Sequence, residues 1–369
     1  MIKKISLGLT SLLLIGLAYL LFWPVPIKPV AWNAPTSNGY TGQFSPNMKL
    51  AGLKTLLIGD HHGPEDVAGR IENGQMMIYT STQSGDIIKI NPRKDTNEVY
   101  ANTGGVPLGL QFDRSGNLII ADAYKGLLSI NKTREVTVLT DMADGIPINY
   151  ADELDIAADG KIYFSDASTK FGAKATGNTL AASLLELMEH GSTGRVLVYD
   201  PADKTTSVLA KDLSFANGVA MCPDDECVLV VETGAYNIHR IWLKGPRAGT
   251  RDIIIENLPG FPDNLNRGQD GRYWLGLTSP RADALDKLSN KPFVRKIVQR
   301  LPASMRPKAQ NYGFIIAIDM NGKVLAQYQD PSGTYPLTTG ASELGDGWLY
   351  ISSLGAKVLG RKNLLHEKF

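Results

Sequence analysis

The stretch that decides the fold is Asp159-Gly160-Lys161-Ile162-Tyr163-Phe164-Ser165-Asp166. A D-G turn followed by a run of β-forming residues is a strong local signal for a β-hairpin. Similar turn-and-strand patterns recur along the chain at 73–79, 115–122, 224–231, 270–276 and 346–352. Self-similarity of this kind indicates an architecture built from repeated structural units.

The spacing of these turns identifies the repeat. Neighbouring turns are 42 to 46 residues apart in three of the five intervals. This matches the roughly 40–50 residues of a four-stranded propeller blade. The two longer intervals predict helical insertions at 172–193 and 281–310. The sequence therefore predicts an all-β, six-bladed propeller over residues 51–369. We expect the segment near Leu53 to Ile58 to pair into the last blade, because an open ring would leave exposed sheet edges.

Composition excludes several other classes. The 369 residues are 43% hydrophobic and 20% charged, which is incompatible with a disordered chain. Lys and Arg number 38 against 37 Asp and Glu, so the basic surplus typical of nucleic-acid binders is missing and no nucleic-acid partner is expected. Two cysteines are too few for a disulfide scaffold or a cysteine-based zinc cluster.

The amino terminus predicts a membrane anchor. The run Ile5–Trp23 has 19 uncharged residues, and as a helix it would be about 28 Å long. Residues 1–23 are therefore interpreted as an uncleaved signal-anchor helix, with a cleaved signal peptide as the alternative. Lys3 and Lys4 would stay in the cytoplasm, which would place the propeller on the periplasmic or lumenal side. Residues 24–50 contain five prolines and predict a stalk.

Each insertion carries a predicted helix. In the first, apolar residues recur at helical spacing between Leu180 and Glu189. In the second, a helix is expected to begin at Pro292. Its apolar stripe would consist of Phe293, Val294, Ile297, Val298 and Leu301. The second insertion is strongly basic, which suits either a lid or a helix that leans on a membrane. A packed decoration with a solvated basic face is the alternative.

Polar residues recur at one register of the predicted inner strands. Counting back from each turn brings acidic and amide side chains to the strand starts of several blades. Asp152, Asn217 and Asp263 occupy that position, Glu65 lies one residue before it and Asn264 one residue after it, and these five form the predicted set. Carboxylates that converge on the channel axis would repel each other, and an oxygen-only donor set favours a hard cation such as Ca²⁺. The alternative is that each residue caps its own strand or turn.

These segments resemble a known superfamily. The resemblance rests on residues 63–66, 107–113, 120–127, 163–168, 215–220, 242–250 and 258–264. The chain is similar to the gluconolactonase–paraoxonase superfamily of six-bladed propellers. Within it, the closest likeness is to the strictosidine synthase-like branch that includes the adipocyte plasma membrane-associated proteins. The resemblance implies an amino-terminal membrane anchor. It also implies calcium ligands at the five positions above, with Asp152 in place of the usual Asn.

The resemblance also implies a chemistry. We expect a calcium-dependent hydrolase acting on a small-molecule ester or lactone, with Asp263 as base or nucleophile. The histidine of paraoxonases is replaced by Leu108, so His62 is a further candidate for the proton acceptor. Strictosidine synthase activity is not expected, because the nearest acid to the synthase position, Glu343, is displaced by one residue. The alternative function is a non-catalytic, membrane-tethered scaffold with a structural calcium.

Cys222 and Cys227 flank a predicted hairpin turn. Outside the cytoplasm they could form a disulfide across that turn. Two half-buried free thiols are the alternative.

Overall fold

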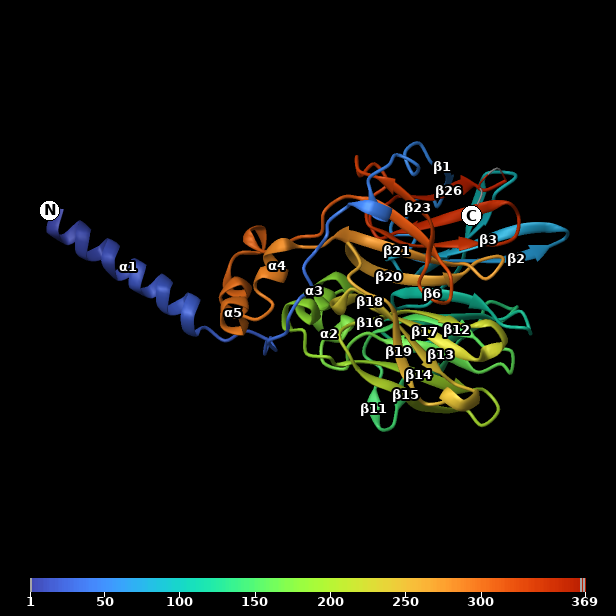
Figure 1. Cartoon of the computed structure of the whole chain (residues 1–369), viewed down its shortest axis with the longest axis horizontal. Helices are drawn as coiled ribbons and strands as arrows, with labels where there is room; N and C mark the ends of the chain where they lie inside the picture. Colours follow the sequence, from blue (N-terminus) through green and yellow to red (C-terminus); the bar gives the residue numbers. More distant parts are fainter. Residues whose placement is uncertain (1, 366, 368) are drawn as a thin grey trace.

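Six four-stranded antiparallel sheets form a ring in the computed structural model, which describes residues 2–365, 367 and 369 (Figure 1). The first three blades are β2 (Val67–Glu72), β3 (Gln75–Ser81), β4 (Asp86–Asn91), β5 (Thr96–Asn102); β6 (Pro107–Phe112), β7 (Leu118–Asp122), β8 (Gly126–Ile130), β9 (Val136–Thr140); and β12 (Ala151–Ile156), β13 (Ile162–Asp166), β14 (Gly194–Asp200), β15 (Thr205–Leu213). The next two are β16 (Ala216–Met221), β17 (Cys227–Glu232), β18 (Asn237–Trp242), β19 (Arg251–Ile255); and β20 (Gly260–Arg267), β21 (Tyr273–Pro280), β22 (Gly313–Ile318), β23 (Val324–Asp330). The short strands β10 (Met142–Ala143) and β11 (Ile146–Pro147) form a separate hairpin.

The sixth blade closes the ring with two ends of the chain. It contains β24 (Thr338–Glu343), β25 (Trp348–Ser353), β26 (Val358–Asn363) and, from the amino-terminal side, β1 (Lys54–Leu57). β1 pairs antiparallel to β26, with Leu56 opposite Leu359. Leu56 is fully buried, whereas its neighbour Leu57 is 54% exposed, as expected for a strand with one face on the core. The predicted closure is confirmed.

The predicted turns are formed where the hairpins need them. Gly160 and Gly347 have φ angles of 91° and 83°, a region that glycine enters without steric cost. The apolar residues of the following strands are buried between neighbouring sheets, for example Phe164 and Ile351. Packing of sheet on sheet around the ring therefore supplies the core.

Helices occupy both predicted insertions. α2 (Ala173–Thr176) and α3 (Thr179–Glu189) lie between β13 and β14, and α4 (Asp283–Lys287) and α5 (Pro292–Arg300) lie between β21 and β22. All four helices gather at one end of the ring (Figure 1). The predicted apolar stripe of α5 is not its buried face. The buried residues of α5 are Arg295, Gln299 and Arg300. The two arginines donate to backbone carbonyls of other segments, among them Met188 and Leu20.

The amino-terminal helix α1 (Ile2–Phe22) extends away from the ring beside α5 (Figure 1). Among the helices of the described residues, none meets both the length and the apolarity needed to cross a membrane. The predicted transmembrane anchor is therefore not supported. The side chains of Lys3 and Lys4, on which the predicted orientation rests, lie outside the described part of the chain.

The segment expected to be a stalk, residues 24–50, instead packs along the propeller (Figure 1). Ile27 is 1% exposed, and the ring of Trp32 stacks on His190 with 3.9 Å between centroids. Three arginines of the second insertion donate to carbonyls of this segment and its approach: Arg281 to Pro35, Arg295 to Val30 and Arg300 to Trp23. Backbone N–H groups of the segment donate in return: Val30 donates to the carbonyl of Glu189, and Trp32 donates to the carbonyl of Ser289.

Cys222 and Cys227 form a disulfide across the turn between β16 and β17. Both residues are buried, and the alternative of two free thiols is excluded.

Candidate functional site

A β-bulge aims the predicted polar residues into the channel. The pairing register between the first two strands shifts at the equivalent place in five blades, including Ala151/Leu154, Ala216/Val219 and Pro262/Leu265. A bulge sets two consecutive residues against one on the partner strand and redirects their side chains. The bulged pairs include Asp152 with Glu153 and Asp263 with Asn264.

The second residue of the bulge in β16 lies close to the backbone of a neighbouring inner strand. Gly218 follows Asn217 at this place, and a Cβ there would lie 2.4 Å from the backbone nitrogen of Leu265. No side chain fits at residue 218 unless the neighbouring strand β20 shifts. Close approach of the inner strands therefore brings the polar residues of neighbouring blades together.

All five predicted metal ligands are buried at the starts of inner strands. Their exposed fractions are 2% for Glu65, 3% for Asp152, 1% for Asn217, 8% for Asp263 and 0% for Asn264. Glu65 lies just before β2, and the other four lie in β12, β16 and β20. All five residues therefore lie near the places where inner strands begin.

Hydrogen bonds between blades join four of the five residues in two pairs. Asn217 donates through Nδ2 to Oδ1 of Asp263 over 2.5 Å. Asn264 donates through Nδ2 to Oε1 of Glu65 over 2.9 Å, and also to its backbone carbonyl. The fifth residue, Asp152, interacts electrostatically with both carboxyls. The structure thus brings together residues that are up to about 200 positions apart.

The three carboxyl groups destabilise one another's charge. Burial raises the pKa of Glu65 well above its usual value, and repulsion from Asp152 and Asp263 raises it further. The pKa of Asp152 is raised in the same way, by burial first and then by Asp263. Burial raises the pKa of Asp263 to about 7, although hydrogen bonds from Asn217 and Thr278 oppose the shift. Among the described residues no ion pair joins an arginine or lysine to Glu65, Asp152 or Asp263, so the repulsion is not relieved by a cationic side chain.

The oxygen atoms that remain unpaired suit a cation. Glu65 Oε2, Asn217 Oδ1 and Asn264 Oδ1 are buried without a hydrogen-bond partner. Unpaired buried oxygens are costly, and a hard cation accepts such oxygens as ligands. In the described chain no three His, Cys, Asp or Glu side chains form a group close enough to hold a metal by themselves. The fit to a cation therefore depends on the amide oxygens as well as the carboxylates.

Three neighbours of the cluster lie outside the predicted ligand set. Thr278, on β21, donates to Oδ2 of Asp263 over 3.1 Å. Glu153 is 1% exposed and leaves Oε2 unpaired, and its pKa is raised by burial and by Asp66 and Glu65. Asp66 accepts from Leu110 N and from the amide of Asn266. Glu153 directly follows Asp152, so the sequence pattern could have indicated it. No feature of the pattern indicated Thr278.

His62 stands apart from the cluster. It is exposed, and in the described chain no hydrogen bond or ion pair joins its ring to a channel residue. Its neighbour His61 contacts Ser84 and Asp86 instead. A catalytic role for His62 stays a prediction without a supporting contact.

An apolar layer covers the end of the channel where the cluster lies. Leu108, Tyr150 and Phe215 near the inner-strand starts pack with residues of the helices, including Ala182 of α3 and Leu285 of α4. Tyr150 also approaches α3 through its hydroxyl, 3.0 Å from Ser183 Oγ. The cluster therefore lies beneath an apolar lining.

Comparison with known proteins identifies relatives over nearly the whole chain. The family model described as strictosidine synthase matches residues 152–246, and the model described as strictosidine synthase-like, N-terminal matches residues 42–90. The adipocyte plasma membrane-associated protein of Salmo salar is 33% identical over 92% of this chain and 84% of its own length. The strictosidine synthase-like 6 protein of Arabidopsis thaliana is 34% identical over 86% of this chain and 83% of its own length.

Solved structures share the fold at low sequence identity. A gluconolactonase from Xanthomonas campestris superposes with a TM-score of 0.61 at 16% identity, covering 91% of this chain and 98% of that one. A calcium-binding protein, regucalcin, from Agrobacterium tumefaciens gives a TM-score of 0.58 at 13% identity, covering 85% and 94%. These two likenesses confirm the propeller architecture.

Proposed function

The chain belongs to the strictosidine synthase-like branch of the gluconolactonase–paraoxonase propeller superfamily, and from that premise we propose that it is a calcium-dependent hydrolase of small esters or lactones. The names of the structural neighbours, a gluconolactonase and a calcium-binding regucalcin, support this reaction class and this metal.

One observation carries the proposal. Three buried carboxyl groups and two amides from four blades meet at the channel start, with Glu65 Oε2, Asn217 Oδ1 and Asn264 Oδ1 unpaired. A purely structural channel would be expected to pair or replace such groups, because buried unpaired polar atoms lower stability. The presence of these unpaired oxygens favours a ligand, and the all-oxygen donor set favours Ca²⁺ over softer metals.

The residues take distinct roles in this proposal. Glu65, Asp152, Asn217, Asp263 and Asn264 would hold the ion. Bound calcium would polarise the substrate carbonyl and stabilise negative charge that develops on its oxygen.

Asp263 would accept the proton from the attacking water. Its second oxygen is held by Thr278, which fixes the orientation of the carboxyl. The water oxygen would bond to the acyl carbon, the bond from that carbon to the leaving oxygen would break, and the proton taken by Asp263 would pass to the leaving oxygen. An ester would give an acid and an alcohol, and a lactone would give a single hydroxy acid. The apolar layer around Tyr150 and Phe215 suits the acyl part of such a substrate.

We also propose association with a membrane through the amino-terminal segment, with the propeller outside the cytoplasm. The names of the adipocyte plasma membrane-associated relatives support membrane association. The Cys222–Cys227 disulfide supports a location outside the cytoplasm, because disulfides persist in oxidising compartments.

An activity screen tests the hydrolase proposal. Purified full-length chain would be assayed with phenyl acetate and with a panel of simple lactones, in calcium and in EGTA. We expect turnover in calcium, loss of turnover in EGTA, and a fall of at least about 100-fold in Asp263→Asn. Asp60→Asn is the matched control, because Asp60 is exposed. Full activity in Asp263→Asn or in EGTA would overturn the proposal.

The second candidate function is a scaffold with a structural calcium. The packed segment at 24–50 and the covered channel end favour it, because both restrict access to the cluster. Calcium binding without turnover across the whole panel would select this alternative.

A further inference from the structure

The apolar stripe of α5 faces away from the propeller. Arg295 and Gln299 are buried residues of this helix, and at about 3.6 residues per turn Ile297 lies on the opposite side from them. Phe293, about one turn before Ile297, is 56% exposed. Ile297 and Leu301 are half-buried. The helix therefore presents part of its apolar stripe to the outside of the molecule.

The exposed apolar surface continues beyond α5. Arg306 donates through Nε to the carbonyl of Leu301 over 2.8 Å and so holds the turn η5 (Ala303–Met305) against the end of the stripe. Met305 in this turn is 64% exposed. Arg300 donates to the carbonyl of Trp23, which is 60% exposed. We call the surface defined by these side chains the cap surface: Trp23, Phe293, Ile297, Leu301 and Met305.

Unpaired positive charge surrounds the cap surface. Residues 287–310 contain seven lysines and arginines and no acidic residue. Among these, Lys291, Lys296 and Lys308 form no ion pair or side-chain hydrogen bond in the described chain. Exposed apolar side chains beside free lysines are typical of surfaces that bind at the headgroup boundary of an anionic lipid layer.

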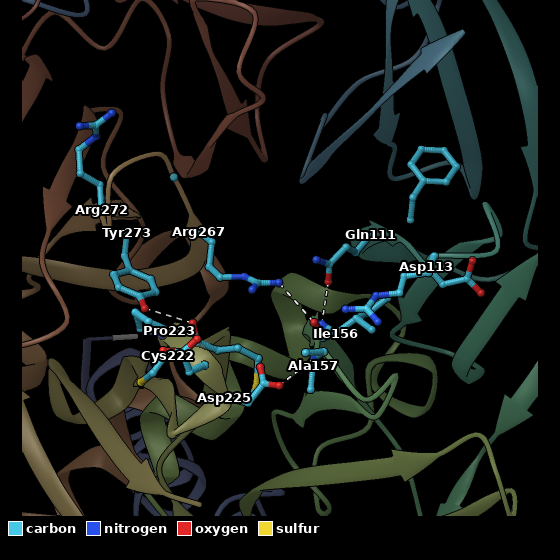
Figure 2. Close-up of a pocket in the computed structure, with 17 residues that line it drawn as sticks. Gln111, Asp113, Ile156, Ala157, Cys222, Pro223, Asp225, Arg267, Arg272 and Tyr273 are labelled. Carbon is cyan, nitrogen blue, oxygen red and sulfur yellow. Dashed lines mark hydrogen bonds between the residues drawn. The ribbon is translucent and has the colours of Figure 1, made fainter. Parts of the chain in front are cut away.

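The other end of the ring does not share this pattern. A cavity of about 500 Å³ opens there, where the inner strands β6, β12, β16 and β20 end (Figure 2). Its charged lining consists of three arginines and three aspartates. Arg267 is paired with the buried carboxylate of Asp155 over 2.6 Å. An anionic surface would therefore be attracted to the helical end of the ring rather than to this end.

The amino-terminal helix leaves the molecule at the cap surface. α1 projects from the ring beside α5 (Figure 1). The Tyr19 hydroxyl donates to the carbonyl of Arg300 over 3.2 Å, so the last turns of α1 and α5 are joined. Further along α1, Leu12 and Leu13 are 67% and 74% exposed. A lipid layer that holds α1 would therefore meet the cap surface next, with Tyr19 and Trp23 at the depth that such side chains favour.

We propose that the cap surface docks on a bilayer that contains anionic lipid. Phe293 and Met305 enter the boundary between headgroups and acyl chains, and Lys291, Lys296 and Lys308 lie among the lipid phosphates. The docking turns the calcium end of the channel toward the membrane. This inference rests on the membrane association proposed above and adds a second contact to it, and it does not depend on hydrolysis.

A fluorescent label at Met305 tests the docking. Full-length Met305→Cys would carry an environment-sensitive fluorophore; Cys222 and Cys227 are joined in a disulfide, so the new thiol is the one labelled. With phosphatidylcholine vesicles that contain about 30% phosphatidylserine, in EGTA, we expect a blue shift and at least about a twofold rise in emission. The response should be much smaller on pure phosphatidylcholine and should fall in high salt.

The same label at Ile71→Cys is the positional control. Ile71 is 69% exposed near the end of β2, at the other end of the ring, and its label should not respond. A silent label at Met305→Cys, equal responses at the two positions, or an equal response with and without phosphatidylserine would overturn the proposal.

Charge reversal tests the role of the lysines. In the Met305→Cys background, Lys291→Glu/Lys296→Glu should raise the lipid concentration at half-maximal response at least about tenfold. Neither lysine has a side-chain partner in the described chain, so the variant should fold normally. Lys94→Glu/Lys211→Glu, at exposed positions in other blades, is the charge-matched control and should respond like the parent. Equal losses in the two double variants would refute a specific contact at the cap surface.

Co-sedimentation with vesicles tests the amino-terminal association separately. If the labelled chain sediments with vesicles while the Met305 label stays silent, the amino-terminal association stands and docking of the cap surface is refuted. If the chain sediments with neither kind of vesicle and the label stays silent, both proposals are refuted.

Discussion

Asn217 donates its amide to Asp263 over 2.5 Å from a neighbouring blade, 46 residues earlier in the chain. The bond holds the two strands β16 and β20 in contact at their bulges. It also turns the amide nitrogen toward the carboxyl and leaves Asn217 Oδ1 buried and unpaired. In this arrangement an amide N–H partly compensates a buried carboxylate, in the way that a bound cation would compensate it more fully.

Replacement of this carboxylate should therefore have opposite effects with and without calcium. In EGTA at pH 8, Asp263→Asn should raise the free energy of unfolding by roughly 1–3 kcal/mol, because it removes a buried charge and keeps an acceptor for Asn217. In saturating calcium the wild type should be the more stable protein. Chemical denaturation under both conditions measures this, and the same ranking in both would contradict it.

The stability of wild type in EGTA should also depend on pH at this residue. The pKa of Asp263 is about 7 in the folded protein against an ordinary value of 3.8, so the folded state keeps a proton that the unfolded state loses. Proton uptake by Asp263 therefore stabilises the folded state at low pH, and this stabilisation is lost as pH rises from about 4 to about 7. The stability difference between wild type and Asp263→Asn should grow across that window. A constant difference from pH 4 to pH 8 would disprove the raised pKa.

Asp166 provides a matched contrast. It is fully buried, but it accepts from Nε of Arg195 over 2.9 Å. Asp166→Asn leaves the Arg195 guanidinium without its carboxylate and should cost about 3–5 kcal/mol in calcium or EGTA. Denaturation midpoints would show this, and a stabilising effect of Asp166→Asn in EGTA would mean that burial alone governs both aspartates.

The closing strand should carry a large part of the stability of the ring. Leu56 is fully buried against the sixth blade, so Leu56→Ala should lower the free energy of unfolding by about 2–5 kcal/mol. Leu57→Ala, on the exposed face of the same strand, should change it by less than about 0.5 kcal/mol. Thermal or chemical unfolding of both variants measures this difference. Equal losses of unfolding free energy in Leu56→Ala and Leu57→Ala would exclude the burial of only one face of β1.

The disulfide should stabilise the fourth blade modestly. It closes a loop of five residues in sequence separation, for which chain entropy predicts about 2 kcal/mol. The free energy of unfolding of the Cys222→Ala/Cys227→Ala variant should be lower by about 2 kcal/mol, so this variant should unfold at a lower denaturant concentration. Reduction of the wild type should reproduce the shift, and an unchanged midpoint in both cases would refute the predicted contribution.

The repeat explains how much the sequence could predict. D-G turns fix hairpins locally, and a side-chain period of two then fixes which residues face the channel, so Asp152 and Asp263 could be placed by counting. The closure by Leu56 follows from the need to cover sheet edges. These features depend on local pattern and on one global constraint.

The features that were mispredicted depend on distant partners. Residues 24–50 carry prolines and no periodicity, so nothing local indicated that Arg281 and Arg295 would bind their carbonyls. The helix α5 was oriented by its apolar stripe, yet Arg295 is the fully buried residue because it satisfies carbonyls at the end of α3. Hydrogen bonds of this kind leave no signal in hydrophobic periodicity.

Calcium titration of the full chain tests the central claim most directly. Calorimetry of metal-free protein should show saturable calcium binding, and at least one bound ion per chain should be lost in Asp152→Asn/Asp263→Asn, with Asp60→Asn unchanged. Absence of saturable calcium binding in the wild type, or binding unaltered by the double substitution, would contradict the account.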